Sequence, residues 1–104
     1  RYHWGEAPEC KPENLARGEW QVSRVYTVVG LAEPALRHAN RCLDICEAHG
    51  LGDWDLAYAY EALARAHKTA GNASEKAAYK KLADEVAIAE ADDREQLEKD
   101  LATL

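Results

Sequence analysis

The sequence lacks the features that mark a membrane-spanning or an exported chain. It contains no run of about 18 apolar residues, so no transmembrane helix is expected. No positively charged start is followed by an apolar stretch, so no signal peptide is visible. Methionine is absent and the chain begins at Arg1, from which we expect a trimmed fragment that has lost its original start and any targeting segment there.

An excess of basic residues is also lacking. The net charge is −6, and residues 84–104 hold 8 acidic and 2 basic side chains, whereas residues 1–83 are balanced. Nucleic acids and anionic membranes attract basic surfaces, so we expect this chain to bind neither.

The sequence contains only 3 cysteines, an odd number. Cys42 and Cys46 are four residues apart, which on a helix separates their Cβ atoms by about 5–6 Å, more than the ~3.8 Å of a disulfide. No disulfide framework is therefore expected, and a reducing cytoplasm fits this chain best.

Apolar and polar residues do not alternate with a period of two over any useful length, so no sheet is expected and the chain is predicted to be all-α. Glycines end the predicted helices, Asp53 is a predicted N-cap, and Asn72 with Glu75 has the spacing of a capping box. The predicted helices cover residues 14–29, 33–49, 53–70, 72–89 and 93–104.

Short links between these helices predict two stacked antiparallel hairpins. Gly30 and Gly71 end equivalent helices 41 residues apart, and each follows an aromatic ring, Tyr26 or His67, by four residues. We expect an extended arm at 1–13, the two hairpins at 14–91 and an acidic capping helix at 92–104. Its stripe of Leu97, Leu101 and Leu104 is expected to close the stack.

Apolar periodicity predicts which side of each helix is buried. Residues 33–49 divide cleanly, with small apolar side chains and histidines on one arc and charged side chains on the other. The expected buried stripe of the first helix is Leu15, Val22, Val25, Tyr26 and Val29. That of the third helix is Leu56, Ala59, Tyr60, Leu63, Ala64, His67 and Ala70.

This pattern resembles the tetratricopeptide repeat, in which hairpins stack into a right-handed solenoid. The positions that match in the second unit are Tyr60, Leu63, Ala64, His67 and Gly71. Those in the first unit are Val22, Ser23, Tyr26, Gly30, Ala35, Ala39, Cys42 and Leu43. Glu19 departs from the motif, since it stands where a bulky apolar residue is usual.

The resemblance implies a protein-binding scaffold with a groove lined by its first and third helices. Carried over by position, the groove residues of the first helix are Arg17, Trp20, Arg24, Thr27 and Val28. Those of the third helix are Tyr58, Glu61, Arg65, Lys68 and Thr69. We expect Trp20, Arg24 and Arg65 to point outward, because they lie off the predicted core stripes.

The basic side chains of this groove favour an acidic peptide or a free C-terminal carboxylate as partner. The acidic segment of the chain itself could occupy the groove, in cis or from a second copy. Alternatively, Trp20 packs on the N-terminal arm or on a lost helix. A second hypothesis is a homodimerisation domain that buries Trp20 against another copy. A third is a helical regulator of a larger enzyme, which uses the groove for a small anion. The chain could also be the C-terminal fragment of a larger helical-repeat regulator.

Two histidines and two cysteines, His38, Cys42, Cys46 and His49, form one stripe at i, i+4, i+8 and i+11. This stripe spans about 16 Å, too far for one metal ion with ligands at ~2 Å. We expect core cysteines, with a site at Cys42, Cys46 and His67 left open, and His67 itself as a hydrogen-bonded core residue. Catalytic motifs are absent, so we expect no enzyme, no cofactor and no metal.

Overall fold

The computed structural model describes residues 12–86, 88 and 91–104. Over these residues the chain forms five α-helices and no strand, which confirms the predicted all-α class. The helices are α1 (Pro12–Val28), α2 (Ala32–Ala48), α3 (Asp53–Ala70), α4 (Ala73–Glu85) and α5 (Ala91–Ala102). The predicted extended arm lies outside the described residues, except for Pro12 and Glu13, which belong to α1.

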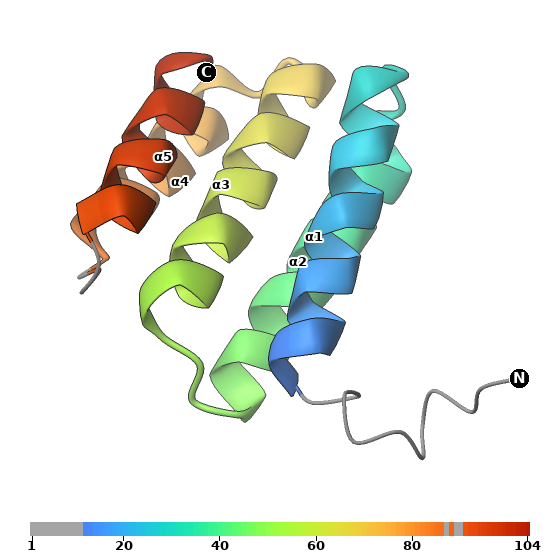
Figure 1. Ribbon diagram of the computed structural model, residues 1–104. Coiled ribbons are helices and arrows are strands. Elements are labelled where there is room, and N and C mark those ends of the chain that lie inside the picture. Colours follow the sequence, from blue (N-terminus) through green and yellow to red (C-terminus); the bar gives the residue numbers. More distant parts are fainter. Residues whose placement is uncertain (1–11, 87, 89–90) are drawn as a thin grey trace, which may run out of the picture.

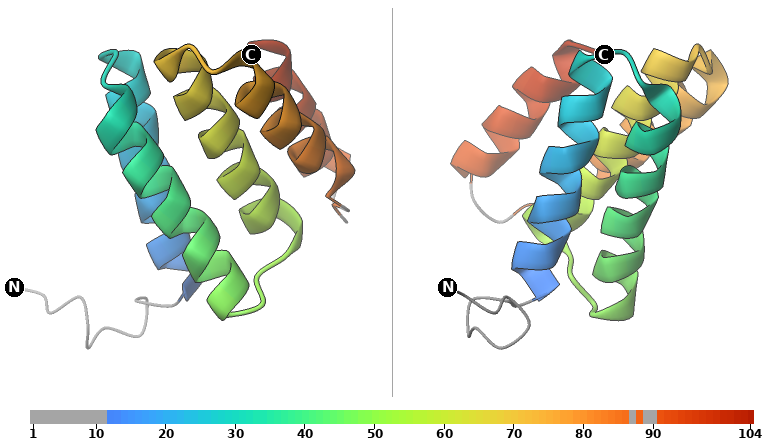
Figure 2. Two further views of the ribbon diagram at one scale, coloured as in Figure 1. Left: turned by 180° about the vertical axis from the view of Figure 1, so that it is seen from behind. Right: turned by 90° about the vertical axis from the view of Figure 1, so that its right-hand side faces the viewer.

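The helices form two layers around α3. Helices α1, α3 and α5 run in the same direction, while α2 and α4 return behind them (Figure 1, Figure 2). Helix α3 contacts all four other helices, which makes it the centre of the molecule. None of the described helices has the length and apolar character that crossing a membrane requires.

Equivalent glycines end α1 and α3, as predicted. Gly30 and Gly71 both have a φ of 82°, in the left-handed region that favours glycine. The next residue in each case, Leu31 or Asn72, donates its backbone N–H to a carbonyl five residues earlier, at 2.8 Å. This is the Schellman arrangement, and it reverses the chain after both helices.

The starts of α3 and α4 differ from the predicted caps. Gly52 occupies the N-cap of α3, so Asp53 is already the first helical residue. Asn72 is the N-cap of α4, but its side chain makes no capping hydrogen bond, so the predicted capping box with Glu75 is not formed. The predicted continuation of this helix to residue 89 is also wrong, because Val86 is extended.

The buried face of α2 is the predicted one. Ala35, Ala39, Cys42 and Cys46 are buried, and the charged arc is exposed. His49 is an exception, since it is exposed at the end of the helix. Small side chains allow close approach, and the hydroxyl of Ser23 on α1 donates to the carbonyl of Ala35 at 2.8 Å.

The predicted core stripe of α1 is wrong except at Tyr26, which is partly buried. Leu15, Val22, Val25 and Val29 are all exposed, Val25 to 61%, whereas Ala16 and Ser23 are buried. Trp20 is partly buried and packs against the core. Helix α1 carries two apolar faces, and the one with small side chains and Trp20 meets α2 and α3 because it permits the closer contact.

Helix α3 is buried more completely than its stripe suggested. The stripe residues Ala59, Leu63 and Ala64 are buried, but so are Ala57, Tyr58, Glu61 and Ala62 on the other side of α3, while Ala70 is exposed. On α5, Leu97 and Leu101 are buried against Ala57, Tyr58 and Ala83, as the capping stripe predicted.

Candidate functional site

A fully buried carboxylate connects α1 and α3 at the predicted groove. Glu61 is 0% exposed and accepts hydrogen bonds from Trp20 Nε1 at 2.9 Å and from Arg65 Nε at 2.6 Å. Arg24 Nη1 lies 3.8 Å from its second oxygen. A buried charge is tolerated only when it is paired in this way. Trp20 and Arg65 are therefore engaged in the helix interface, contrary to the outward orientation expected from the sequence, and Glu61, which was expected to line the groove, is buried there.

The acidic C-terminal helix packs beside three of the predicted groove residues. Tyr58 donates its hydroxyl to Asp100 at 2.5 Å, Arg65 contacts the carbonyl of Asp100 and the hydroxyl of Thr103, and Lys68 contacts the carbonyl of Thr103 at 2.9 Å. Burial and the bond to Asp100 raise the pKa of the Tyr58 hydroxyl above its ordinary value. The segment thus meets these side chains in cis, one of the arrangements considered from the sequence.

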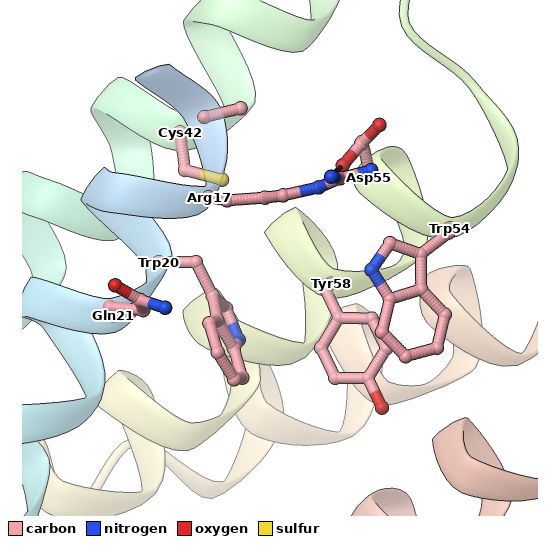
Figure 3. A pocket seen from close by; sticks show the side chains of 8 residues that line it. Arg17, Trp20, Gln21, Cys42, Trp54, Asp55 and Tyr58 are labelled. Carbon is pink, nitrogen blue, oxygen red and sulfur yellow. Dashed lines mark hydrogen bonds and ion pairs between the residues drawn. The ribbon is translucent and has the colours of Figure 1, made fainter. Parts of the chain in front are cut away.

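A cavity of about 220 Å³ lies between the N-terminal halves of α1 and α3. Its walls are mainly apolar and are formed by Ala16, Trp20, Cys42, Trp54 and Tyr58. The rings lie close together, with Tyr58 5.3 Å from Trp20 and 4.3 Å from Trp54, measured between centroids. Figure 3 shows these side chains around one hollow.

Polar side chains line the same cavity. Arg17 Nε contacts Asp55 Oδ1 at 2.9 Å, and the Arg17 side chain is 52% exposed while that of Asp55 is 11% exposed. Arg17 thus extends from α1 to α3 along one side of the hollow (Figure 3). Gln21 is also part of the lining.

A second, open hollow of about 350 Å³ lies towards the C-terminal ends of α1 and α3. Three cationic side chains line it, those of Arg24, Arg65 and Lys68. Arg65 is bonded to Glu61 and to α5, and its side chain is 12% exposed. Arg24 is 37% exposed and Lys68 lies on the surface, so these two retain donors directed at solvent. The remaining predicted groove residues, Thr27, Val28 and Thr69, complete the lining.

The described cysteine and histidine residues do not form one common site. Cys42 and Cys46 are buried free thiols at the α2 interface, and the pKa of Cys42 is raised by its hydrogen bond with Cys46 and by burial. His67 stacks on Tyr79, with ring centroids 5.5 Å apart, and contacts the Asn72 amide, so it is hydrogen-bonded as predicted, although it is partly exposed and not a core residue. Across the described part of the chain, no group of three or more His, Cys, Asp or Glu side chains is arranged to hold a metal ion.

Glu19, the departure from the repeat motif, has a role between α1 and α2. Its carboxylate contacts His38 Nδ1 at 2.6 Å and Arg41 Nε at 3.2 Å. The His38 ring also stacks on Tyr26, with centroids 5.7 Å apart. A polar residue fits this position because its partners on α2 are polar.

Comparison of the chain with family models, with curated proteins and with solved structures gives no match. The tetratricopeptide pattern therefore stays a resemblance.

Four cavity residues were missed in the sequence, namely Ala16, Gln21, Trp54 and Asp55. Trp54 precedes Tyr58 by four residues, a spacing that places both rings on one side of a helix. This spacing is a signal that a search for paired aromatic residues would have found.

Proposed function

We propose that this chain is a protein-interaction module of the tetratricopeptide-like kind, which binds a peptide or a partner helix across α1 and α3. One observation carries the proposal. The aromatic cavity and the cationic hollow lie along the same two helices, the first at their N-terminal halves and the second towards their C-terminal ends, so one extended ligand can reach both. Such a combination of buried aromatic rings and arginine is typical of residues that dominate binding energy at interfaces.

The arrangement of helices supports the solenoid part of this proposal. Helices α1 and α3 end in the same glycine turn 41 residues apart, and both run parallel to α5 in one layer (Figure 1). In such a stack the first helix of each hairpin lines the binding face. Exposed donors of Arg24 and Lys68 favour a partner that is acidic or that presents a carboxylate.

The test measures binding of fluorescein-labelled, glutamate-rich peptides of about eight residues, with a free or an amidated C-terminus, by fluorescence anisotropy. Arg24→Gln with Lys68→Gln is expected to weaken binding about tenfold or more, with unchanged helicity. Arg37→Gln with Lys80→Gln, which removes two exposed charges from α2 and α4, is the matched control. Equal affinities for the two double variants would refute the proposed site.

A second candidate function is self-association through the outer face of α1. Its observation is the exposed apolar stripe of Leu15, Val22, Val25 and Val29, which no described element covers. Trp20, by contrast, is engaged with Glu61 and Tyr58, so a second copy would meet the valines rather than this tryptophan. Sedimentation of the chain with and without Val25→Lys tests this candidate, and a monomer at millimolar concentration would exclude it.

A further inference from the structure

The aromatic cavity has the size and the walls of a binding site for one ring. Apolar cavities of about 150 Å³ already admit benzene, and this one measures about 220 Å³. Ala16 and Cys42 line it from α1 and α2, and three aromatic rings complete the apolar wall (Figure 3). The planes of Trp20 and Tyr58 are 89° apart, so they form a corner that offers a guest both face and edge contacts.

The polar lining favours an uncharged guest. The Asp55 carboxylate is the acidic group in the cavity wall, and Arg17 Nε already neutralises it at 2.9 Å. A cationic ligand would have to displace Arg17, and an anionic ligand would lie beside Asp55. An uncharged ring neither displaces Arg17 nor places a negative charge beside Asp55.

Entry of a ring into the cavity requires little rearrangement of the polar residues that line it. The Arg17 side chain is half exposed, and partly exposed ion pairs of this kind contribute little to stability. The guanidinium of Arg17 and the amide of Gln21 can swing towards solvent and then contact a hydroxyl group on the guest.

We propose that this cavity binds a single uncharged aromatic ring, supplied either by a small molecule or by a phenylalanine or tyrosine side chain of a bound peptide. In its peptide form this inference rests on the proposed function, since the ring anchors a partner that also reaches the cationic hollow along the same two helices. In its small-molecule form it stands independently of any peptide.

The experiment titrates the full chain with toluene, p-cresol and tetramethylammonium, and follows the indole N–H signals of Trp20 and Trp54 by NMR. Toluene and p-cresol are expected to shift both signals, with dissociation constants on the order of 1 mM, because each buries one ring. Tetramethylammonium is expected to shift neither. A stronger response to tetramethylammonium, or none to the two rings, would overturn the proposal.

Two substitutions fill the cavity from different helices, Ala16→Leu and Cys42→Leu. Each is expected to weaken ring binding at least tenfold, while Ala78→Leu on the exposed side of α4 leaves it unchanged. If one filling variant does not fold, the other provides the measurement. Unchanged ring binding in a folded filling variant would place the ring elsewhere and refute the site.

A final pair of peptides separates this inference from the proposed function. They are glutamate-rich peptides that differ in one central residue, phenylalanine or alanine. Preference for the phenylalanine peptide supports both proposals. Binding of free rings without either peptide supports the cavity as a small-molecule site and refutes the peptide function. Equal binding of both peptides, without any response to free rings, refutes the ring site and leaves the peptide function standing.

Discussion

The indole N–H of Trp20 donates a 2.9 Å hydrogen bond to Glu61, a carboxylate that lies entirely out of solvent between α1 and α3. Arg65 occupies its other oxygen at 2.6 Å. This contact makes the candidate binding face a structural junction as well, because the residues that shape the face also hold the two hairpins together.

Removing the carboxylate is expected to destabilise the fold strongly. Glu61→Ala leaves the Trp20 N–H and the Arg65 guanidinium without their buried partner, so the free energy of unfolding should fall by about 3–5 kcal/mol. Trp20→Phe removes one hydrogen bond and should cost about 1–3 kcal/mol. Urea unfolding followed by circular dichroism measures both, with exposed Glu47→Ala as control. A loss in Glu61→Ala no larger than that of the control would contradict this account.

Ionisation of Tyr58 should be linked to stability at high pH. Burial and the bond to Asp100 raise its pKa in the folded state above the ordinary value near 10. The neutral hydroxyl therefore stabilises the fold fully below about pH 10, and this contribution is lost as the pH rises further. Between pH 9 and 11, unfolding free energy should decline more steeply in the unsubstituted chain than in Tyr58→Phe. Parallel curves would show that this hydroxyl is not buried against Asp100.

The thiols of α2 should be unreactive in the folded protein. Cys42 and Cys46 are each 1% exposed, and the pKa of Cys42 is raised by its hydrogen bond with Cys46 and by burial. In a Cys10→Ser background, modification by Ellman's reagent at pH 8 should be at least a hundredfold slower than in denaturant. Fast labelling without denaturant would place these cysteines at the surface.

Lysine should be tolerated on the outer stripe of α1 but not on the buried stripe of α3. Val25 is 61% exposed, so Val25→Lys should change the unfolding free energy by less than about 0.5 kcal/mol, measured at a concentration where the chain is monomeric. Leu63 is 0% exposed, and Leu63→Lys should unfold the chain because it buries an unpaired charge. Similar destabilisation by the two substitutions would show that the α1 stripe is buried, as the sequence predicted.

Helix ends and the face of α2 were predictable because they depend on local chemistry. Gly30 and Gly71 adopt the left-handed conformation that glycine favours, and Ala35, Ala39, Cys42 and Cys46 form the one face of α2 without charge. The predicted cap at Asp53 was wrong because the neighbouring Gly52 takes that position, whereas Asn72 is the N-cap of α4 as predicted but forms no side-chain capping bond. In α1 the more hydrophobic stripe was predicted to be buried, but the face with smaller side chains is the one that packs against α2 and α3.

The ten predicted groove residues all lie on α1 and α3, but their roles depend on their neighbours. Arg17, Arg24 and Lys68 keep exposed side chains, whereas Trp20, Tyr58, Glu61 and Arg65 are committed to contacts between helices. Periodicity places a residue on a face of its own helix, and it carries no information about which other helix covers that face.

The sequence by itself determined the helices, the turns between them and the position of the acidic segment, because propensity and glycine geometry act within a few residues. Tertiary structure alone decided which side of α1 is buried, that Glu61 is a buried junction, and that Trp20, Trp54 and Tyr58 enclose a cavity. These features arise from contacts between residues about 40 positions apart, where close packing selects the small side chains over the larger ones.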